Sequence, residues 1–147
     1  MKKLLIIIAV GFAIVGGAAW AYPATAATPG RSGWAEPADY SYRVEYGIFG
    51  PSMGTYDITV RDHKVTAVER LASAAWPDAE DWVTVENAWT LADLEAKYFQ
   101  AMADSESDAT ITYDPVTGAP AAIYLDWIVM AVDDEESFQV LAFDPEG

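Results

Sequence analysis

The sequence predicts an α+β fold in which an antiparallel β-sheet of about six strands, in the order βββ-α-βββ, packs against one α-helix. Short runs of alternating apolar and polar residues occur in both halves of the chain, and a single amphipathic helical segment lies between them. Strands and helices therefore do not alternate. This segregation is typical of an antiparallel sheet with one face covered by a helix.

The first three strands are expected in the first half of the chain. From 40 to 48, large apolar residues alternate with small or polar ones, which is the period of two of a half-buried strand. A second strand is expected at 53–61 and a third at 64–69, joined by the two-residue turn of Asp62 and His63. Both turn residues then need a positive φ, which Asp and His tolerate better than most residues.

The helix is expected from Thr90 to about Ala103. Thr90 followed by Asp93 forms a capping-box sequence, in which a hydroxyl and a carboxylate satisfy free N–H groups of the first turn. The segment before it, 71–89, shows no hydrophobic period and is expected to be a long loop. The apolar stripe of the helix comprises Leu91, Leu94, Tyr98 and Met102. That stripe must be covered, and the sheet is the available cover.

Three more strands are expected after the helix. A fourth strand at 108–114 leads into a type I turn at 114–118 closed by its glycine, and a fifth strand begins at Ala119. An apolar run extends this fifth strand to Val132. The four consecutive acids at 133–136 are expected to form a loop before the last strand, at 138–143.

The last strand carries apolar residues on both faces. Leu141 and Phe143 alternate with Phe138, Val140 and Ala142. Such a strand is either central in the sheet or covered by a partner.

Residues 1–26 are expected to be a signal peptide. Two lysines precede an uncharged run to Ala21, and Ala24-Thr25-Ala26 then offers the small residues that signal peptidase requires. The alternative is an uncleaved membrane anchor, because residues 4–22 make 19 residues, or about 28 Å of helix. Both alternatives place the rest of the chain outside the cytoplasm, secreted or in the periplasm or cell envelope.

The remainder divides into a linker and one domain. Residues 27–39 are rich in Pro, Gly, Ala and small polar residues, which is a linker composition. Residues 40–147 are expected to form a single globular domain, and 52% hydrophobic residues supply an ample core.

Charge and cysteine content exclude several classes of function. The net charge is -15, from 23 acidic and 8 basic residues, and such a surface repels phosphate backbones, so nucleic acid is excluded as a partner. A membrane is expected to be contacted only through an uncleaved N-terminal segment. The absence of cysteine excludes disulfides, thiol nucleophiles and thiolate metal sites.

The chain from residue 58 onwards resembles a family of small bacterial exported proteins known only as a domain of unknown function, the 6174 family. The pieces that carry this resemblance are ITVRDHKVTAVE at 58–69, TLADLEAKYF at 90–99, ITYDPVTGAPAAIYLD at 111–126 and VDDEESFQV at 132–140. The resemblance implies an exported, mainly antiparallel domain. It brings no catalytic residues, because none are established for the family.

Candidate chemistry is sparse. His63 is the only histidine, and its predicted place in a two-residue turn is poor for excluding water from a reaction. The carboxylates at 133–136 are of the type that calcium prefers, but consecutive residues point in divergent directions. Asp126 interrupts an apolar stretch, and strand alternation explains it as an outward residue. We therefore assign no catalytic, cofactor-binding or metal residue, and no cofactor.

Three tryptophans in the predicted long loop are candidates for binding. Trp76, Trp82 and Trp89 form either an aromatic platform for a sugar or peptide, or a cover folded down over an open end of the sheet. The second interpretation is favoured.

By elimination, the sequence predicts a non-enzymatic binding or interaction module of the cell envelope or exterior, whose partner is unknown and is expected to be a protein. Two alternatives stay open. One is a carboxylate-based hydrolase, which needs two acids set across a cleft. The other is a calcium-responsive structural module.

Overall fold

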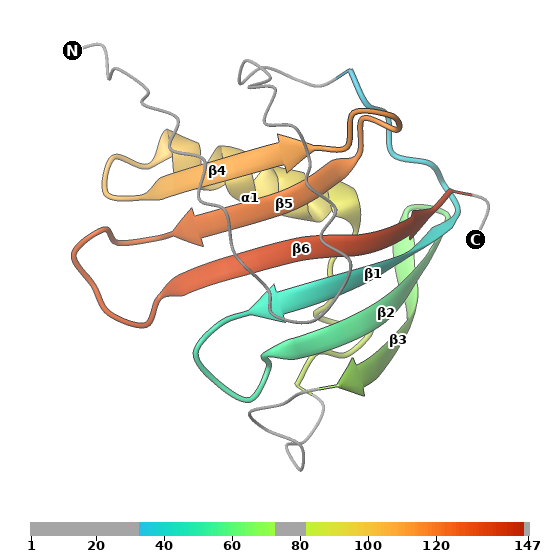
Figure 1. Ribbon diagram of the computed structural model, residues 1–147, viewed down its shortest axis with the longest axis horizontal. Helices are drawn as coiled ribbons and strands as arrows, with labels where there is room; N and C mark the ends of the chain where they lie inside the picture. The colour runs from blue at the N-terminus through green and yellow to red at the C-terminus, as the bar shows by residue number, and fades with distance from the viewer. Residues whose placement is uncertain (1–32, 73–81, 146–147) are drawn as a thin grey trace. The chain divides into compact units, whose positions relative to one another are not determined.

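The computed structural model of the chain describes residues 33–72 and 82–145 (Figure 1). Its elements are β1 (Tyr40–Gly47), β2 (Gly54–Arg61), β3 (Lys64–Ala72), α1 (Leu91–Ala103), β4 (Asp108–Tyr113), β5 (Pro120–Asp126) and β6 (Glu135–Asp144). The order βββ-α-βββ and the α+β fold predicted from the sequence are confirmed.

One six-stranded sheet contains every strand, in the order β3-β2-β1-β6-β5-β4. Each neighbouring pair is antiparallel. The helix α1 packs on β4 and β5, behind the sheet in the view of Figure 1. Strand β6 lies between β1 and β5 and so joins the two halves of the chain. The first alternative for the last strand, a central position in the sheet, is therefore confirmed.

The sheet has two distinct ends. Gly47 pairs with Ser137, and Asp126 pairs with both Glu135 and Asp108, so these residues lie at one end. The segments 48–53, 104–107 and 127–134 connect elements there, at the left of Figure 1, and we call it the loop end. The opposite end holds the short connections 62–63 and 114–119, and we call it the turn end.

The core lies on the face of the sheet that α1 covers. Alternate residues of β1 and β2 point into it, as the period of two predicts. The helix buries Leu91, Leu94, Tyr98 and Ala101. The predicted inclusion of Met102 in this stripe was wrong. Met102 is exposed because Ala101 lies nearer the centre of the buried arc and the helix ends one residue later.

The helix start agrees with the predicted capping box. The Thr90 hydroxyl accepts a hydrogen bond from the Asp93 amide at 3.1 Å, and the Asp93 carboxylate accepts one from the Thr90 amide at 3.0 Å. Two further amides of the first turn also have partners. The Leu91 amide donates to the Tyr40 hydroxyl and the Ala92 amide to the Glu36 carboxylate. The helix is therefore anchored to β1 at its N-terminus.

A bulge in β6 changes which residues of this strand face the core. Val140 pairs with Val44 and Ala142 pairs with Arg43, so Leu141 is an extra residue between them. A one-residue insertion reverses the alternation beyond it. Phe143 consequently packs against the core, on the same face as Phe138, and the predicted opposite facing of these residues was wrong.

Strand boundaries differ from the prediction around the acidic segment. Strand β5 ends at Asp126 instead of continuing to Val132, and 127–134 is a loop. Strand β6 begins at Glu135. The expected loop at 133–136 is therefore wrong in its second half, because Glu135 and Glu136 pair with β5.

Part of the segment expected to be a linker packs on the domain. Trp34 contacts the core cluster, and Glu36 accepts hydrogen bonds from Tyr40 and from the start of α1. An aromatic ring and a carboxylate supply these contacts within an otherwise small-residue segment. The predicted signal peptide or anchor, the linker as far as residue 32, and Trp76 lie outside the described residues. Within 33–72 and 82–145, no helix is long and apolar enough to cross a membrane.

Candidate functional site at the loop end

Large apolar side chains are exposed together at the loop end. Phe49 is 77% exposed, Met130 91% and Val132 82%. Ile128 and Val129, in the same loop as Met130, are about half exposed. Several exposed large apolar residues on two loops at the same end of a sheet are typical of an interaction surface.

The loop that carries Phe49 is held by side chains of two other strands. Arg70 of β3 donates hydrogen bonds to the carbonyl oxygens of Pro51 and Met53, at 3.1 and 3.2 Å. The Tyr56 hydroxyl of β2 donates to the Ser52 carbonyl at 2.7 Å. These contacts fix the backbone of 48–53, so Phe49 is presented outward without the need to order the loop first.

The loop 127–134 is anchored in the same way. The Ile128 amide donates to the Asp134 carboxylate at 2.8 Å, and the Val129 amide donates to the Glu106 carbonyl at 3.0 Å. The Ser107 hydroxyl donates to the Trp127 carbonyl at 2.7 Å. The exposed apolar residues of both loops are therefore carried by backbone that hydrogen bonds hold in place.

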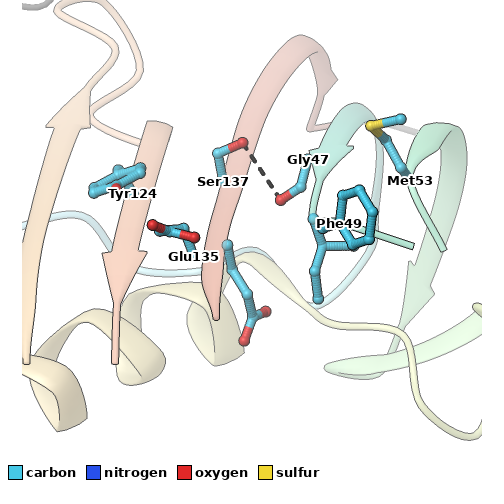
Figure 2. Close-up of a pocket in the computed structure, with 8 residues that line it drawn as sticks. Gly47, Phe49, Met53, Tyr124, Glu135 and Ser137 are labelled. Carbon is cyan, nitrogen blue, oxygen red and sulfur yellow. Dashed lines mark hydrogen bonds between the residues drawn. The ribbon is translucent and has the colours of Figure 1, made fainter. Parts of the chain in front are cut away.

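An open groove of about 320 Å³ lies at the loop end, lined by residues of the loop 48–53 and of the adjoining ends of β1, β5 and β6. Figure 2 shows Tyr124 of β5 on one side of it and Phe49 with Met53 on the other. The strands carrying Ser137 and Gly47 lie between these walls, and the Ser137 hydroxyl donates to the Gly47 carbonyl at 3.5 Å. A side chain at Gly47 would meet the Ser137 hydroxyl, which would have to rotate away.

A row of carboxylates crosses the sheet beside the groove. Asp108, Asp126 and Glu135 are cross-strand neighbours on β4, β5 and β6, and Asp134 precedes Glu135. Loss of solvation, followed by the charges of Asp134, Glu135 and Asp108, raises the pKa of Asp126. One carboxylate oxygen each of Asp126 and Asp134 is buried without a hydrogen-bond partner. The local potential is therefore strongly negative.

The same potential acts on Tyr124 in the groove wall. Partial burial, followed by the nearby carboxylates of Asp126 and Glu135, raises the pKa of its hydroxyl. Among the described residues, no group of three or more histidines or carboxylates is placed to hold a metal ion.

Glu136 has a different environment from Glu135 although the two are adjacent. Its carboxylate points to the helix side and lies 3.0 Å from the Lys97 ammonium. It also accepts hydrogen bonds from the Trp127 indole at 2.9 Å and the Tyr46 hydroxyl at 3.2 Å. The Lys97 ammonium lies 5.7 to 5.8 Å from the ring centres of Trp89, Trp127 and Phe138. This half-buried ion pair braces the start of β6 beneath the groove.

The sequence candidates are distributed over both ends of the sheet. His63 lies at the turn end, where its Nδ1 is 3.3 Å from the Glu36 carboxylate and its ring is largely exposed. The favoured interpretation, in which these tryptophans fold down over the sheet, was wrong for Trp82, which is exposed. It holds for Trp89, which packs against Tyr46 and Phe138. Within the described part of the chain, these tryptophans do not form a common platform.

Sequence reasoning missed the residues that build the groove. Phe49 beside the Gly50-Pro51 turn was a usable signal, because an aromatic residue in a turn has little core to enter. The run from Ile128 to Val132 was interpreted as strand, and its exposure was not foreseen. Tyr124 and Glu135 are brought together only by the pairing of β5 with β6.

These features define a small α+β domain with a braced, acidic groove at one end of an antiparallel sheet. A model of a family of unknown function, DUF6174, matches residues 29–145, and the chain belongs to this family. The resemblance found in the sequence is thereby confirmed. No curated protein and no solved structure matches the chain.

Proposed function

We propose that this chain is an exported, non-enzymatic binding module of the cell envelope or exterior, and that it binds a segment of a protein at the loop end of its sheet. The observation that carries this proposal is the joint exposure of Phe49, Met130 and Val132 on loops whose backbones are fixed. Fixed apolar anchors contribute most of the affinity in typical protein interfaces, because little entropy is lost when they bind.

Two further features support the proposal. The uncharged N-terminal run behind Lys2 and Lys3 favours export of the domain. The two adjacent carboxylates that line the groove, Glu135 and Glu136, are also poorly placed for hydrolysis, because consecutive strand residues point to opposite faces and Glu136 is held by Lys97. A carboxylate-based hydrolase needs two acids that converge across a cleft.

The experiment is a capture of partners from envelope extract with the full chain as bait, compared with two variants. In the first, Phe49, Met130 and Val132 are each replaced by Ser. In the second, Val116, which is 90% exposed at the turn end, is replaced by Ser. We expect the triple variant to retain a specific partner about tenfold less than wild type, whereas Val116→Ser retains it unchanged.

Two results would oppose the proposal. If wild type retains nothing that an unrelated acidic protein of equal charge does not also retain, the binding-module interpretation loses its support. If the triple variant retains a specific partner as well as wild type does, the binding surface lies elsewhere.

A further inference from the structure

The groove at the loop end has the dimensions of a side-chain pocket. Its volume of about 320 Å³ lies at the lower end of ligand pockets, which are roughly 300 to 1,000 Å³. The walls are mostly apolar and comprise Ile48, Phe49, Met53 and the ring of Tyr124. A pocket of this kind accepts one extended side chain of a partner and not a folded element.

The two carboxylates that line the groove differ in their charge balance. Glu136 is paired with Lys97, whereas no ion pair among the described residues neutralises Glu135, and none of the described lining residues is basic. Arg43 pairs with Asp57, and Arg70 donates to carbonyl oxygens of the loop 48–53. Glu135 is flanked by Asp126 and Asp134, so the groove combines aromatic walls with one carboxylate that lacks a cation.

We infer that this groove binds an arginine side chain of the partner segment, with its guanidinium on Glu135 and its alkyl chain and planar group between Tyr124 and Phe49. The inference rests on the proposed function and names the chemistry that the partner must offer. Arginine fits better than lysine because its weakly hydrated, planar guanidinium both stacks on aromatic rings and pairs with a carboxylate in a bidentate manner.

The test is an NMR titration of the full chain with three capped tripeptides, Gly-Arg-Gly, Gly-citrulline-Gly and Gly-Lys-Gly. Citrulline keeps the shape of arginine without its charge. We expect the arginine peptide to cause saturable shifts of the Tyr124, Glu135 and Ser137 amides, the lysine peptide to bind more weakly, and the citrulline peptide to cause no such shifts. Glu135→Gln should weaken binding of the arginine peptide about fivefold.

The matched control is Glu69→Gln. Glu69 is an exposed carboxylate on β3, two strands away from β1, so this variant removes the same charge without touching the groove. It should bind the arginine peptide about as wild type does. Tyr124→Leu tests the aromatic wall separately and should also weaken binding.

Equal binding of the citrulline and arginine peptides, equal weakening by Glu69→Gln and Glu135→Gln, or binding of lysine above arginine would overturn the inference. These outcomes leave the proposed function intact if capture of a protein partner still depends on Phe49, Met130 and Val132. If capture does not depend on those residues but the arginine peptide still binds in the groove, the proposed function fails, whereas arginine binding by the groove is still supported.

Discussion

The two ends of the sheet are built by different means, although both connect antiparallel strands of the same sheet. At the turn end, Asp62 and His63 adopt positive φ angles of 50° and 59° and close β2 onto β3 in two residues. At the turn between β4 and β5, Asp114 accepts hydrogen bonds from the Val116 amide, the Thr117 amide and the Thr117 hydroxyl. The 114–118 turn thus satisfies its own backbone, whereas the Asp62 and His63 amides donate to the Asp39 carboxylate and the Ala38 carbonyl.

The connections at the loop end depend on distant residues. Arg70 of β3 holds the segment 48–53, and the Glu106 carbonyl in the connection 104–107 holds the segment 127–134. Lys97 of α1 pairs with Glu136 near the start of β6. The turn at 114–118 needs only its own sequence, whereas the loops 48–53 and 127–134 are held by other segments and carry exposed apolar residues at their tips. This difference is why we place binding at the loop end.

The largest effect that tests this difference is expected for Lys97→Met. The variant leaves Glu136, whose side chain is only 13% exposed, without its cation, and should lower the free energy of unfolding by about 2 kcal/mol. Denaturant unfolding followed by tryptophan fluorescence measures this value, since Trp89 and Trp127 surround the ammonium.

Arg43→Met is the matched control for Lys97→Met. Arg43 forms a bidentate pair with Asp57 on the open face of the sheet, where the two side chains are 45% and 39% exposed. Its loss should lower the free energy of unfolding clearly less than Lys97→Met does, because water screens exposed pairs. If the two variants cost the same, the ion pair under the loop end is no better shielded than a surface pair, and the bracing argument is wrong.

A smaller effect is expected at the turn end for Asp114→Ala. Hydrogen bonds from the Thr117 and Val116 amides lower the pKa of Asp114, so the ionised carboxylate stabilises the turn. The variant should lower the free energy of unfolding by about 1 kcal/mol at pH 7. This contribution of the wild-type carboxylate is present above its ordinary pKa and is lost as the pH falls through its lowered folded pKa.

Asp114→Asn is the control at this position, because its amide oxygen still accepts from the turn. It should cost less than Asp114→Ala. Binding of the partner should be unchanged in both variants, and a loss of binding would show that the two ends are not independent.

The contrast between the ends also explains what the sequence predicted. Features set by neighbours along the chain were predicted correctly, including the Thr90 capping box, the positive φ of Asp62 and His63, and Gly118 with a φ of 75°. The errors lie where a distant strand decides the result. The bulge at Leu141 arises from the pairing of β6 with β1. Glu136 belongs to β6, and not to a loop, because it pairs with β5 and its carboxylate binds Lys97.

The candidate site shows the same limit more strongly. Tyr124, Glu135 and Phe49 belong to three separate segments, and no local pattern in any of them indicates a groove. The sequence singled out the acidic segment 133–136, but only its pairing with β5 places Glu135 and Glu136 in a strand, whose alternation directs them to opposite faces. Only the strand register reveals this separation.

The smallest effect is expected for Asp126→Asn at the loop end, and its sign is opposite to the others. Because the folded pKa of Asp126 is raised above its ordinary value of 3.8, folding becomes less favourable as the pH rises from about 4 through the raised pKa. Asp126→Asn removes this penalty. The variant should therefore be more stable than wild type at pH 7, and the difference should shrink as the pH falls below 3.8, where the wild-type carboxyl becomes protonated in the unfolded state as well. Melting temperatures of the two proteins at pH 3.5 and pH 7 measure the difference, which cancels the titration of all other groups. A variant less stable than wild type at pH 7 would mean that the ionised carboxylate is stabilised in the row.

If calcium also raised the wild-type melting temperature but not that of the variant, the row would be a cation site, and the calcium-responsive alternative would then be favoured over a pocket for arginine.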